Sequence, residues 1–301
     1  MIEAGKVGSV NLCMFSANAD GLNGKGHSLK YEVKESKSAI FTIQETKFKK
    51  KGRFKLDDFV IFESIRKNKE KGGSMLGIHK SLEPVLIEEY EETFELIVAE
   101  FKVANKEARI MTGYGPQESW KDSEKMPFFV ALEEEISKAH LAGKSIIIEL
   151  DANSKLGTEY VPGDPHSISS NGKILKGIIE RHALCVANGL PTKSLGLITR
   201  CISTVQSTEE SNIDYVIISD DMIPFLVSIK IDDKRKKVLT SITTKLKKTV
   251  KQESDHNSKI TKFDLTWSSE INKERIEIFN FKDKKGQEMF KEMTSNNTKL
   301  S

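Results

Sequence analysis

The chain has 301 residues and a formal net charge of +3, and 38% of its residues are hydrophobic and 30% charged. This composition is typical of a soluble globular protein with a sizeable core, and it excludes collagen-like and wholly disordered chains. No apolar run approaches the roughly 20 residues of a membrane helix, and the N-terminus has no signal pattern. The three cysteines show neither disulfide nor zinc spacing. We therefore expect an intracellular protein without a membrane partner.

Short runs rich in β-branched and aromatic residues, most of them followed by turn signals, predict strands along much of the chain. In chain order these runs cover 7–15, 39–44, 59–63, 74–79, 95–101, 108–114, 144–150, 212–219 and 260–267. Apolar residues at helical spacing predict helices over 126–141 and 173–182. No linker splits residues 1–268, so we expect these residues to form one domain of α/β layers. A charged tail follows over 269–301.

The charged residues are distributed unevenly. Residues 25–55 contain ten lysines and arginines against three glutamates, and residues 230–262 contain eleven against four acidic residues. The stretch 83–135 is acidic, with fourteen carboxylates against five basic residues. Two basic segments form one basic face if the fold brings them together. Because lysine-rich segments are usually solvated surface, charge alone indicates nucleic-acid binding only weakly.

Polar side chains recur where the expected strands end, which is where layered α/β proteins place their sites. They include carboxylates, two amides, a tyrosine and a histidine: Asn18, Asp20, Glu45, Tyr114, Asp151, Asn153, Asp214, Asp255 and His256. Mg²⁺ prefers such oxygen ligands, whereas zinc is a poor fit without a cysteine–histidine grouping. The sequence therefore predicts a site for a hard metal ion and a phosphate.

Six short motifs follow one another in the order found in the endonuclease/exonuclease/phosphatase superfamily. They are SANADGL at 16–22, QETK at 44–47, GYGP at 113–116, LDAN at 150–153, IDY at 213–215 and SDH at 254–256. The chain thus resembles exonuclease III-type apurinic endonucleases and, most of all, the endonuclease domains of non-LTR (LINE-type) retrotransposons. This resemblance implies a four-layered α/β sandwich, in which two packed mixed β-sheets are flanked by helices.

The resemblance also implies catalytic roles. Asp151 resembles the base that takes a proton from the attacking water, with Asn153 orienting it. His256 resembles the imidazole that binds the scissile phosphate, and Asp214 would hold and charge this ring. Tyr114 resembles the phenol that contacts the phosphate in the transition state. Taken singly, each residue also fits an ordinary turn, surface or packing position.

For the metal, Glu45 resembles the Mg²⁺ ligand, Asn18 the amide that supports the metal or phosphate, and Asp255 a further carboxylate nearby. Mn²⁺ is a possible substitute. Two positions depart from the superfamily pattern: Leu150 replaces the usual glycine before Asp151, and Gln117 replaces an asparagine. These departures leave the turn at Asp151 and one phosphate contact in question.

The implied reaction is Mg²⁺-dependent phosphodiester hydrolysis that leaves a 3′-hydroxyl and a 5′-phosphate. Segment 199–211 resembles a hairpin that retrotransposon endonucleases press into a DNA groove, and 278–283 with 286–290 resembles a connector toward a reverse transcriptase. We therefore expect a monomeric nuclear DNA-nicking domain that continues covalently into a reverse transcriptase. The expected DNA-binding residues are Lys47, Lys49, Lys50, Lys51, Thr199, Arg200 and Ser211.

Two alternatives stay open at this point. The first is an apurinic/apyrimidinic-site repair endonuclease with the same chemistry. The second belongs to another class: a catalytically inactive nucleic-acid-binding module of the same fold, which the departures at Leu150 and Gln117 leave possible.

Overall fold

The computed structural model describes residues 11–66, 72–91, 94–104, 106–203, 207–245 and 248–265. All of them belong to one compact unit, Met1–Thr266. The expected tail and the ends 7–10 and 266–267 of two expected strands lie outside the described residues.

Two large sheets, two hairpins and three helices make up the described part of the chain. The first sheet has the strand order β10 (Ser194–Leu195), β14 (Leu226–Ile231), β17 (Lys259–Asp264), β1 (Asn11–Asn18), β2 (Ile40–Gln44), β4 (Ser74–His79) and β3 (Phe59–Ser64). The second has the order β5 (Val85–Tyr90), β6 (Glu95–Val103), β7 (Lys106–Tyr114), β8 (Ser145–Asp151), β13 (Asp214–Ser219) and β9 (Leu184–Val186). The hairpins are β11 (Arg200–Ser203) with β12 (Thr208–Ser211), and β15 (Thr240–Lys245) with β16 (Lys248–Glu253). The helices are α1 (Gly26–Glu35), α2 (Asp122–Leu141) and α3 (Ser170–Arg181), with short 3₁₀ turns at Lys80–Leu82, Ala187–Gly189 and Asp220–Phe225.

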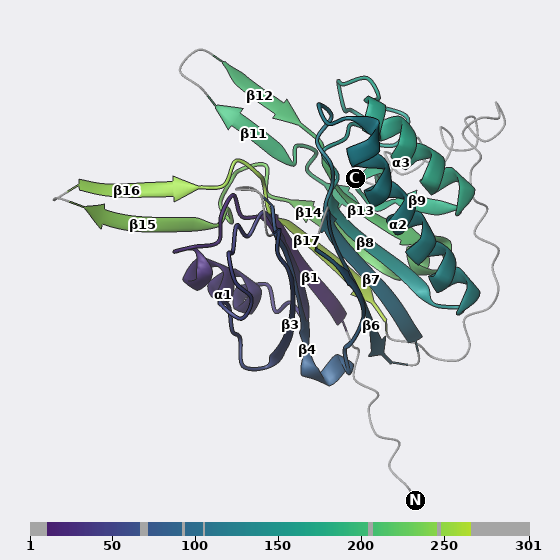
Figure 1. Ribbon diagram of the computed structural model, residues 1–301, viewed down its shortest axis with the longest axis horizontal. Coiled ribbons are helices and arrows are strands. Elements are labelled where there is room, and N and C mark those ends of the chain that lie inside the picture. Colours follow the sequence, from purple (N-terminus) through teal and green to yellow (C-terminus); the bar gives the residue numbers. More distant parts are fainter. Residues whose placement is uncertain are drawn as a thin grey trace, which may run out of the picture. The chain divides into compact units, whose positions relative to one another are not determined.

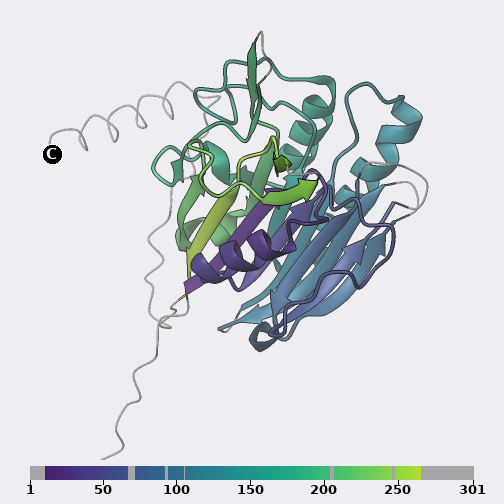
Figure 2. The same ribbon diagram turned by 90° about the vertical axis from the view of Figure 1, so that its left-hand side faces the viewer.

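The layers are those of the expected sandwich, which is confirmed. Both sheets are mixed, because each contains parallel and antiparallel neighbours. Figure 1 shows them packed between α1 on one side and α2 with α3 on the other. In Figure 2 α1 lies across the first sheet. Among the described residues, no helix is both long and apolar enough to cross a bilayer.

Both predicted helices exist, and both begin earlier than expected because of their N-terminal caps. The Glu124 carboxylate of α2 accepts a hydrogen bond from the Lys121 N–H at 3.2 Å, as in a capping box. The Ser169 hydroxyl accepts one from the Gly172 N–H at 3.1 Å and starts α3 at Ser170. Helix α1 was not predicted at all. It buries only Leu29, Glu32 and Val33, too few apolar residues to stand out in a lysine-rich segment.

Strand pairing brings the predicted polar residues to one edge. In the parallel pairs, Asn18 of β1 lies opposite Gln44 of β2, and Tyr114 of β7 lies opposite Asp151 of β8. In the antiparallel pair of β13 with β8, Asp214 is the partner of Asp151. The ends of these strands therefore converge where the two sheets meet.

A buried ion pair joins the two sheets below this edge. The Glu149 Oε2 atom of β8 lies 3.4 Å from the Lys259 Nζ atom of β17, and both side chains are almost completely buried. Leu150, the residue in place of the usual glycine, points into the opposite core and is also buried. The core thus accommodates Leu150 in place of the usual glycine, and Asp151 still lies at the edge where the strand ends converge.

This ion pair yields a stability prediction. Replacing Lys259 with methionine should lower the free energy of unfolding by about 3–5 kcal/mol, because it leaves the Glu149 carboxylate buried without a partner. Adding Glu149→Gln should restore most of the loss, since a neutral amide costs far less to bury than an unpaired carboxylate. Urea unfolding of the three proteins measures this, and losses that simply add in the double variant would contradict it.

Candidate active site

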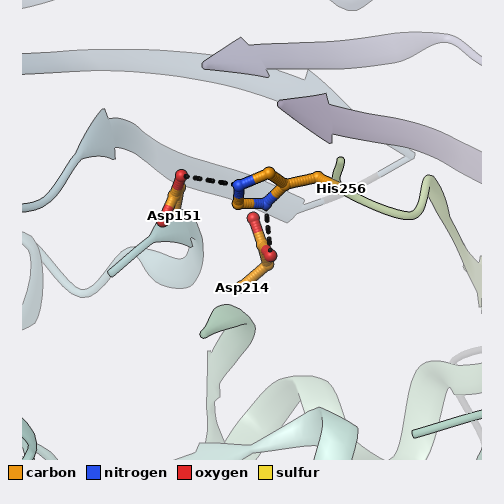
Figure 3. A group of neighbouring side chains, drawn as sticks. All are labelled: Asp151, Asp214 and His256. Carbon is orange, nitrogen blue, oxygen red and sulfur yellow. Dashed lines mark hydrogen bonds and ion pairs between the residues drawn. The ribbon is translucent and has the colours of Figure 1, made fainter. Parts of the chain in front are cut away.

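Three buried side chains form the centre of the site (Figure 3). The Asp214 Oδ2 atom accepts a hydrogen bond from His256 Nδ1 at 2.9 Å. The other ring nitrogen, Nε2, lies 3.8 Å from Asp151 Oδ2. The imidazole is therefore held between two carboxylates that come from neighbouring strands of the second sheet, while His256 itself follows the hairpin β15–β16.

The first sheet contributes Asn18 and Glu45. The Asn18 amide Nδ2 donates to Asp151 Oδ2 at 2.7 Å and also approaches Glu45 Oε1 at 3.4 Å. Its Oδ1 atom accepts from the Asp20 N–H at 2.8 Å, which fixes the orientation of the amide. Asn18 thus links the residue expected to bind metal with the residue expected to act as the base. The Ser254 hydroxyl donates to the Asn18 carbonyl at 2.6 Å and ties the SDH loop to β1.

Tyr114 is buried and its hydroxyl accepts a hydrogen bond from Gln117 Nε2 at 3.0 Å. Burial, together with the negative charges of Asp151 and Glu45, raises the pKa of Tyr114 far above its usual value. The phenol therefore stays protonated and is a hydrogen-bond donor. Gln117, the second departure from the superfamily pattern, supports this phenol.

The charges in the centre are strongly coupled. Burial alone would lower the pKa of His256, but the Asp214 and Asp151 carboxylates outweigh it and raise this pKa to about 9. Burial tends to raise the pKa of Asp214, and the adjacent imidazolium reverses this and lowers it. Burial and the Asp214 charge raise the pKa of Asp151 to about 7. At neutral pH the centre therefore holds an imidazolium–carboxylate pair beside a carboxylate poised to take up a proton.

Asn153 lies in a left-handed turn, with a φ of 44°, a conformation that asparagine tolerates better than most residues. Its backbone N–H donates to Asp151 Oδ1 at 3.3 Å, and its side-chain Nδ2 donates to the Gly115 carbonyl at 2.9 Å. A Cβ atom at Gly115 would lie 2.6 Å from the Ala152 carbonyl oxygen, so only glycine allows this approach. Asn153 therefore joins the turn after Asp151 to the loop after Tyr114.

The hairpin β11–β12 is attached directly to the SDH loop. Arg200 forms an isolated bridge with His256, and its Nε atom lies 3.0 Å from Asp255 Oδ2. The expectation that Thr199 contacts DNA is wrong: its side chain is completely buried, and its hydroxyl accepts from the Asp214 N–H at 3.1 Å. Thr199 instead supports Asp214. Ser211 is also largely buried, but it lines a cavity of about 410 Å³ beside Asn153.

The four lysines expected to bind DNA have different surroundings. Lys47 is half-buried and forms ion pairs with Asp20 and with Glu45, the latter at 3.5 Å. Lys51 forms ion pairs with the carboxylates of Glu89 and Glu91. Lys49 and Lys50 are exposed.

Sequence reasoning missed Lys25, a supporting residue. Its side chain is almost completely buried, and its ammonium donates to the Ala19 carbonyl at 2.6 Å. Burial lowers the pKa of this lysine. The residue stabilises the loop that follows Asn18. Because it lies in a Gly- and Lys-rich segment, nothing in the sequence distinguishes it from a surface lysine.

The donor atoms fit a hard cation best beside Glu45. Asp151, Asp214 and His256 are close enough together to hold a metal ion, since one ligand atom from each lies within 4.8 Å of the others. However, an imidazolium bonded to Asp214 offers no lone pair to a cation. The Glu45 carboxylate supplies oxygen donors and is partly accessible. Asn18 turns its amide nitrogen toward Glu45, while its oxygen accepts from the Asp20 N–H, so Asn18 supports the Glu45 carboxylate instead of offering an oxygen beside it. Asp255, the third expected ligand, is paired with Arg200.

Comparisons with known proteins place this geometry on a known fold. Neither the protein-family models nor the curated protein sequences give a match. Among solved structures, the endonuclease domain of TRAS1, a telomere-specific non-LTR retrotransposon, superposes with a TM-score of 0.61 at 17% identity, covering 85% of this chain and all of that domain. The 3′–5′ exonuclease NExo from Neisseria meningitidis superposes with a TM-score of 0.61 at 15% identity, covering 84% of this chain and 100% of that one.

A second NExo structure, described as a 3′ phosphatase variant bound to a product DNA hairpin, gives the same TM-score at 14% identity, covering 84% of this chain and 99% of that one. At these identities the similarity establishes the fold. The chain therefore has the endonuclease/exonuclease/phosphatase fold that its motifs predicted.

Proposed function

We propose that this chain is a metal-dependent nuclease that cuts one strand of DNA and leaves a 3′-hydroxyl and a 5′-phosphate. The main observation behind the proposal is that Asp151 accepts a hydrogen bond from Asn18 and faces His256, whose ring is paired with Asp214. A buried carboxylate next to an imidazolium and an oriented amide is suited to activating water beside a phosphate. The intact geometry also argues against the inactive-module alternative.

The protein side chains have distinct tasks in this reaction. Asp151 accepts the proton of the attacking water, a role for which a pKa near 7 is well matched. The Nε2–H of His256 and the phenol of Tyr114 donate to the non-bridging phosphate oxygens as negative charge builds on them. Asp214 keeps the imidazole charged and oriented. Asn18 holds Asp151, and Asn153 fixes the turn that presents it.

Glu45 would hold the divalent cation, for which we propose Mg²⁺, with Mn²⁺ as a substitute, and the Asn18 amide N–H would orient the Glu45 carboxylate. Asp255 would join Glu45 as a ligand if its pair with Arg200 opens. When bound, such an ion supplies electrostatic stabilisation of the negative charge on the phosphate and the leaving oxygen.

DNA is the proposed substrate because basic segments distant in sequence meet near the site. The Ser28 hydroxyl of α1 accepts from the Thr240 N–H at 3.3 Å, which joins the segment 25–55 to the hairpin β15–β16. Figure 1 shows this hairpin and β11–β12 projecting from the same side of the sandwich. Lys49, Lys50 and Arg200 are the side chains that we expect to contact phosphates there. Thr199 is excluded from this set.

Within this class we favour the retrotransposon type, in which the nick primes reverse transcription in the nucleus and the monomeric domain continues into a reverse transcriptase. The hairpin β11–β12 adopts the form expected for segment 199–211. The TRAS1 domain has this fold and is covered completely. The expected connector segments 278–283 and 286–290 lie outside the described residues.

Comparing intact with abasic DNA tests the proposed substrate. The purified chain with Mg²⁺ should nick intact supercoiled plasmid, and a polymerase should extend the nick without further processing because it ends in a 3′-hydroxyl. A strong preference for a duplex with one abasic site would instead favour the repair endonuclease. If the chain cleaves neither the intact plasmid nor the abasic duplex, the nuclease proposal is contradicted.

A further inference from the structure

The loop that presents Glu45 has an unusual backbone. Glu45 and Lys47 have positive φ angles of 50° and 53°, a conformation that is unfavourable for residues with side chains. On one side, the loop is fixed by the segment after Asn18, because the Gly21 N–H donates to the Glu45 carbonyl at 2.8 Å. Such a conformation persists only where the surroundings hold it, so the other side of the loop must be held as well.

A two-glycine turn holds that other side. The Gly73 carbonyl accepts from the Thr46 N–H at 2.9 Å, and the Gly72 carbonyl accepts from the Lys47 N–H at 2.9 Å. A Cβ atom at Gly73 would lie 2.5 Å from the Thr46 Oγ1 atom. The turn therefore packs directly against the residue next to Glu45, and a shift of the turn displaces the Glu45 loop.

The completely buried carboxylate of Glu95 holds this two-glycine turn in place. The Glu95 Oε1 atom accepts from the Gly73 N–H at 2.9 Å, and its Oε2 atom is bound by the Arg66 guanidinium. The relative exposures of the two side chains are 0% and 4%. Glu95 is also the cross-strand partner of Tyr114. Glu95 thus connects the strand that carries Tyr114, the phenol proposed to contact the phosphate, to the loop that presents Glu45, the carboxylate proposed to bind the metal.

We infer that Glu95 is a positioning residue for the metal site: through the Gly73 N–H it sets the place of Glu45. This inference rests on the proposed function, in which Glu45 binds the cation. A buried ion pair is commonly no more stabilising than an apolar pair of the same volume, so stability alone does not account for Glu95 and Arg66 here. Residues that orient metal ligands from behind typically change metal affinity 10- to 100-fold when they are replaced.

Binding of Mn²⁺ alone, followed by electron paramagnetic resonance without DNA, tests the inference. Two neutral double variants differ only in the acceptor that they offer to Gly73. E95Q/R66M keeps an amide oxygen there and should bind Mn²⁺ within about threefold of the wild type, whereas E95L/R66M removes it and should weaken binding about 10- to 100-fold. The control E100L/R109M removes the ion pair that joins β6 to β7, with an N–O distance of 2.8 Å, and should leave the affinity unchanged.

The variant E45Q separates failure of this inference from failure of the proposed function. If E45Q binds Mn²⁺ as tightly as the wild type, the proposed metal site is wrong. If E45Q loses binding but E95L/R66M keeps it, or if E95Q/R66M loses it equally, the positioning role is wrong. Should E95L/R66M fail to fold by circular dichroism, G73A replaces it, since its Cβ would press on Thr46 while the ion pair stays intact. Wild-type affinity in folded G73A would likewise overturn the inference.

Discussion

Replacing Asp151 with asparagine is expected to slow DNA cleavage by about 10²- to 10⁴-fold, the range typical for loss of a general base. The asparagine side chain keeps the shape of the aspartate and can still contact Asn18, but it cannot accept the proton of the attacking water. Stability should not fall, because burial already disfavours the charged form of Asp151 and raises its pKa to about 7. Single-turnover cleavage of a labelled duplex and a thermal melt measure the two effects.

Asp221→Asn is the matched control for this variant. Asp221 accepts a hydrogen bond from the Ser145 hydroxyl at 2.6 Å, at the opposite end of β8 from Asp151. The same chemical change at that end should leave the cleavage rate at the wild-type level. A folded Asp151→Asn protein that cleaves at the wild-type rate would remove Asp151 from the role of base.

Replacing Asp214 with asparagine should reduce the rate near pH 7.5 by about 10²- to 10³-fold, comparable to the loss of one transition-state donor. In the wild type, Asp214 and Asp151 outweigh burial and keep the pKa of His256 at about 9, so the imidazole is charged up to that pH. Without the Asp214 charge, burial lowers this pKa, and the ring becomes neutral at lower pH. The alkaline limb of the pH–rate profile should therefore move to lower pH.

The raised pKa of His256 also makes the stability of the folded protein depend on pH, and stability, like the cleavage rate, falls as the ring loses its proton. Because the pKa of His256 is raised in the folded state from an ordinary value of 6.5, its contribution to stability is complete below about pH 6.5 and is lost as the pH rises through about 9. This pH-dependent part should disappear in Asp214→Asn. Asp164→Asn is the control, since the buried carboxylate of Asp164 pairs with a different histidine, His166, at 2.8 Å. An unchanged alkaline limb in Asp214→Asn would show that Asp214 does not set the charge of His256.

The sequence predicted the layers and most strands because those signals are local. Strand β4 was predicted with its observed bounds, since apolar and β-forming residues between turn signals mark it in a window of six residues. Helix α1 escaped because it lies in a lysine-rich segment and buries few apolar residues. The strands β15 and β16 escaped because their sequences, TSITTK and KTVKQE, contain one apolar residue each. Their structure depends on contacts with distant parts of the chain, such as that of Ser28 with Thr240.

The same contrast between local sequence patterns and contacts of distant residues applies to the site. Asp151, Asp214 and His256 lie in short motifs of fixed order, so they could be nominated without coordinates. Thr199 was assigned to DNA because its hairpin was recognised, whereas its burial beneath Asp214 depends on how the hairpin joins the SDH loop. Glu95 has no motif around it. Its contact with Gly73 brings together residues 22 positions apart across two sheets, and no local pattern reports such a contact.

The most direct test of whether the two sheets build one metal-dependent nuclease site is the nicking of supercoiled plasmid in Mg²⁺. The two comparisons are the same reaction in EDTA and the reaction of the Glu45→Gln variant. The expected result is open-circular product from the wild type in Mg²⁺, none in EDTA, and a rate at least about 10²-fold lower for the variant. Equal nicking in EDTA, or by folded Glu45→Gln, would contradict the account.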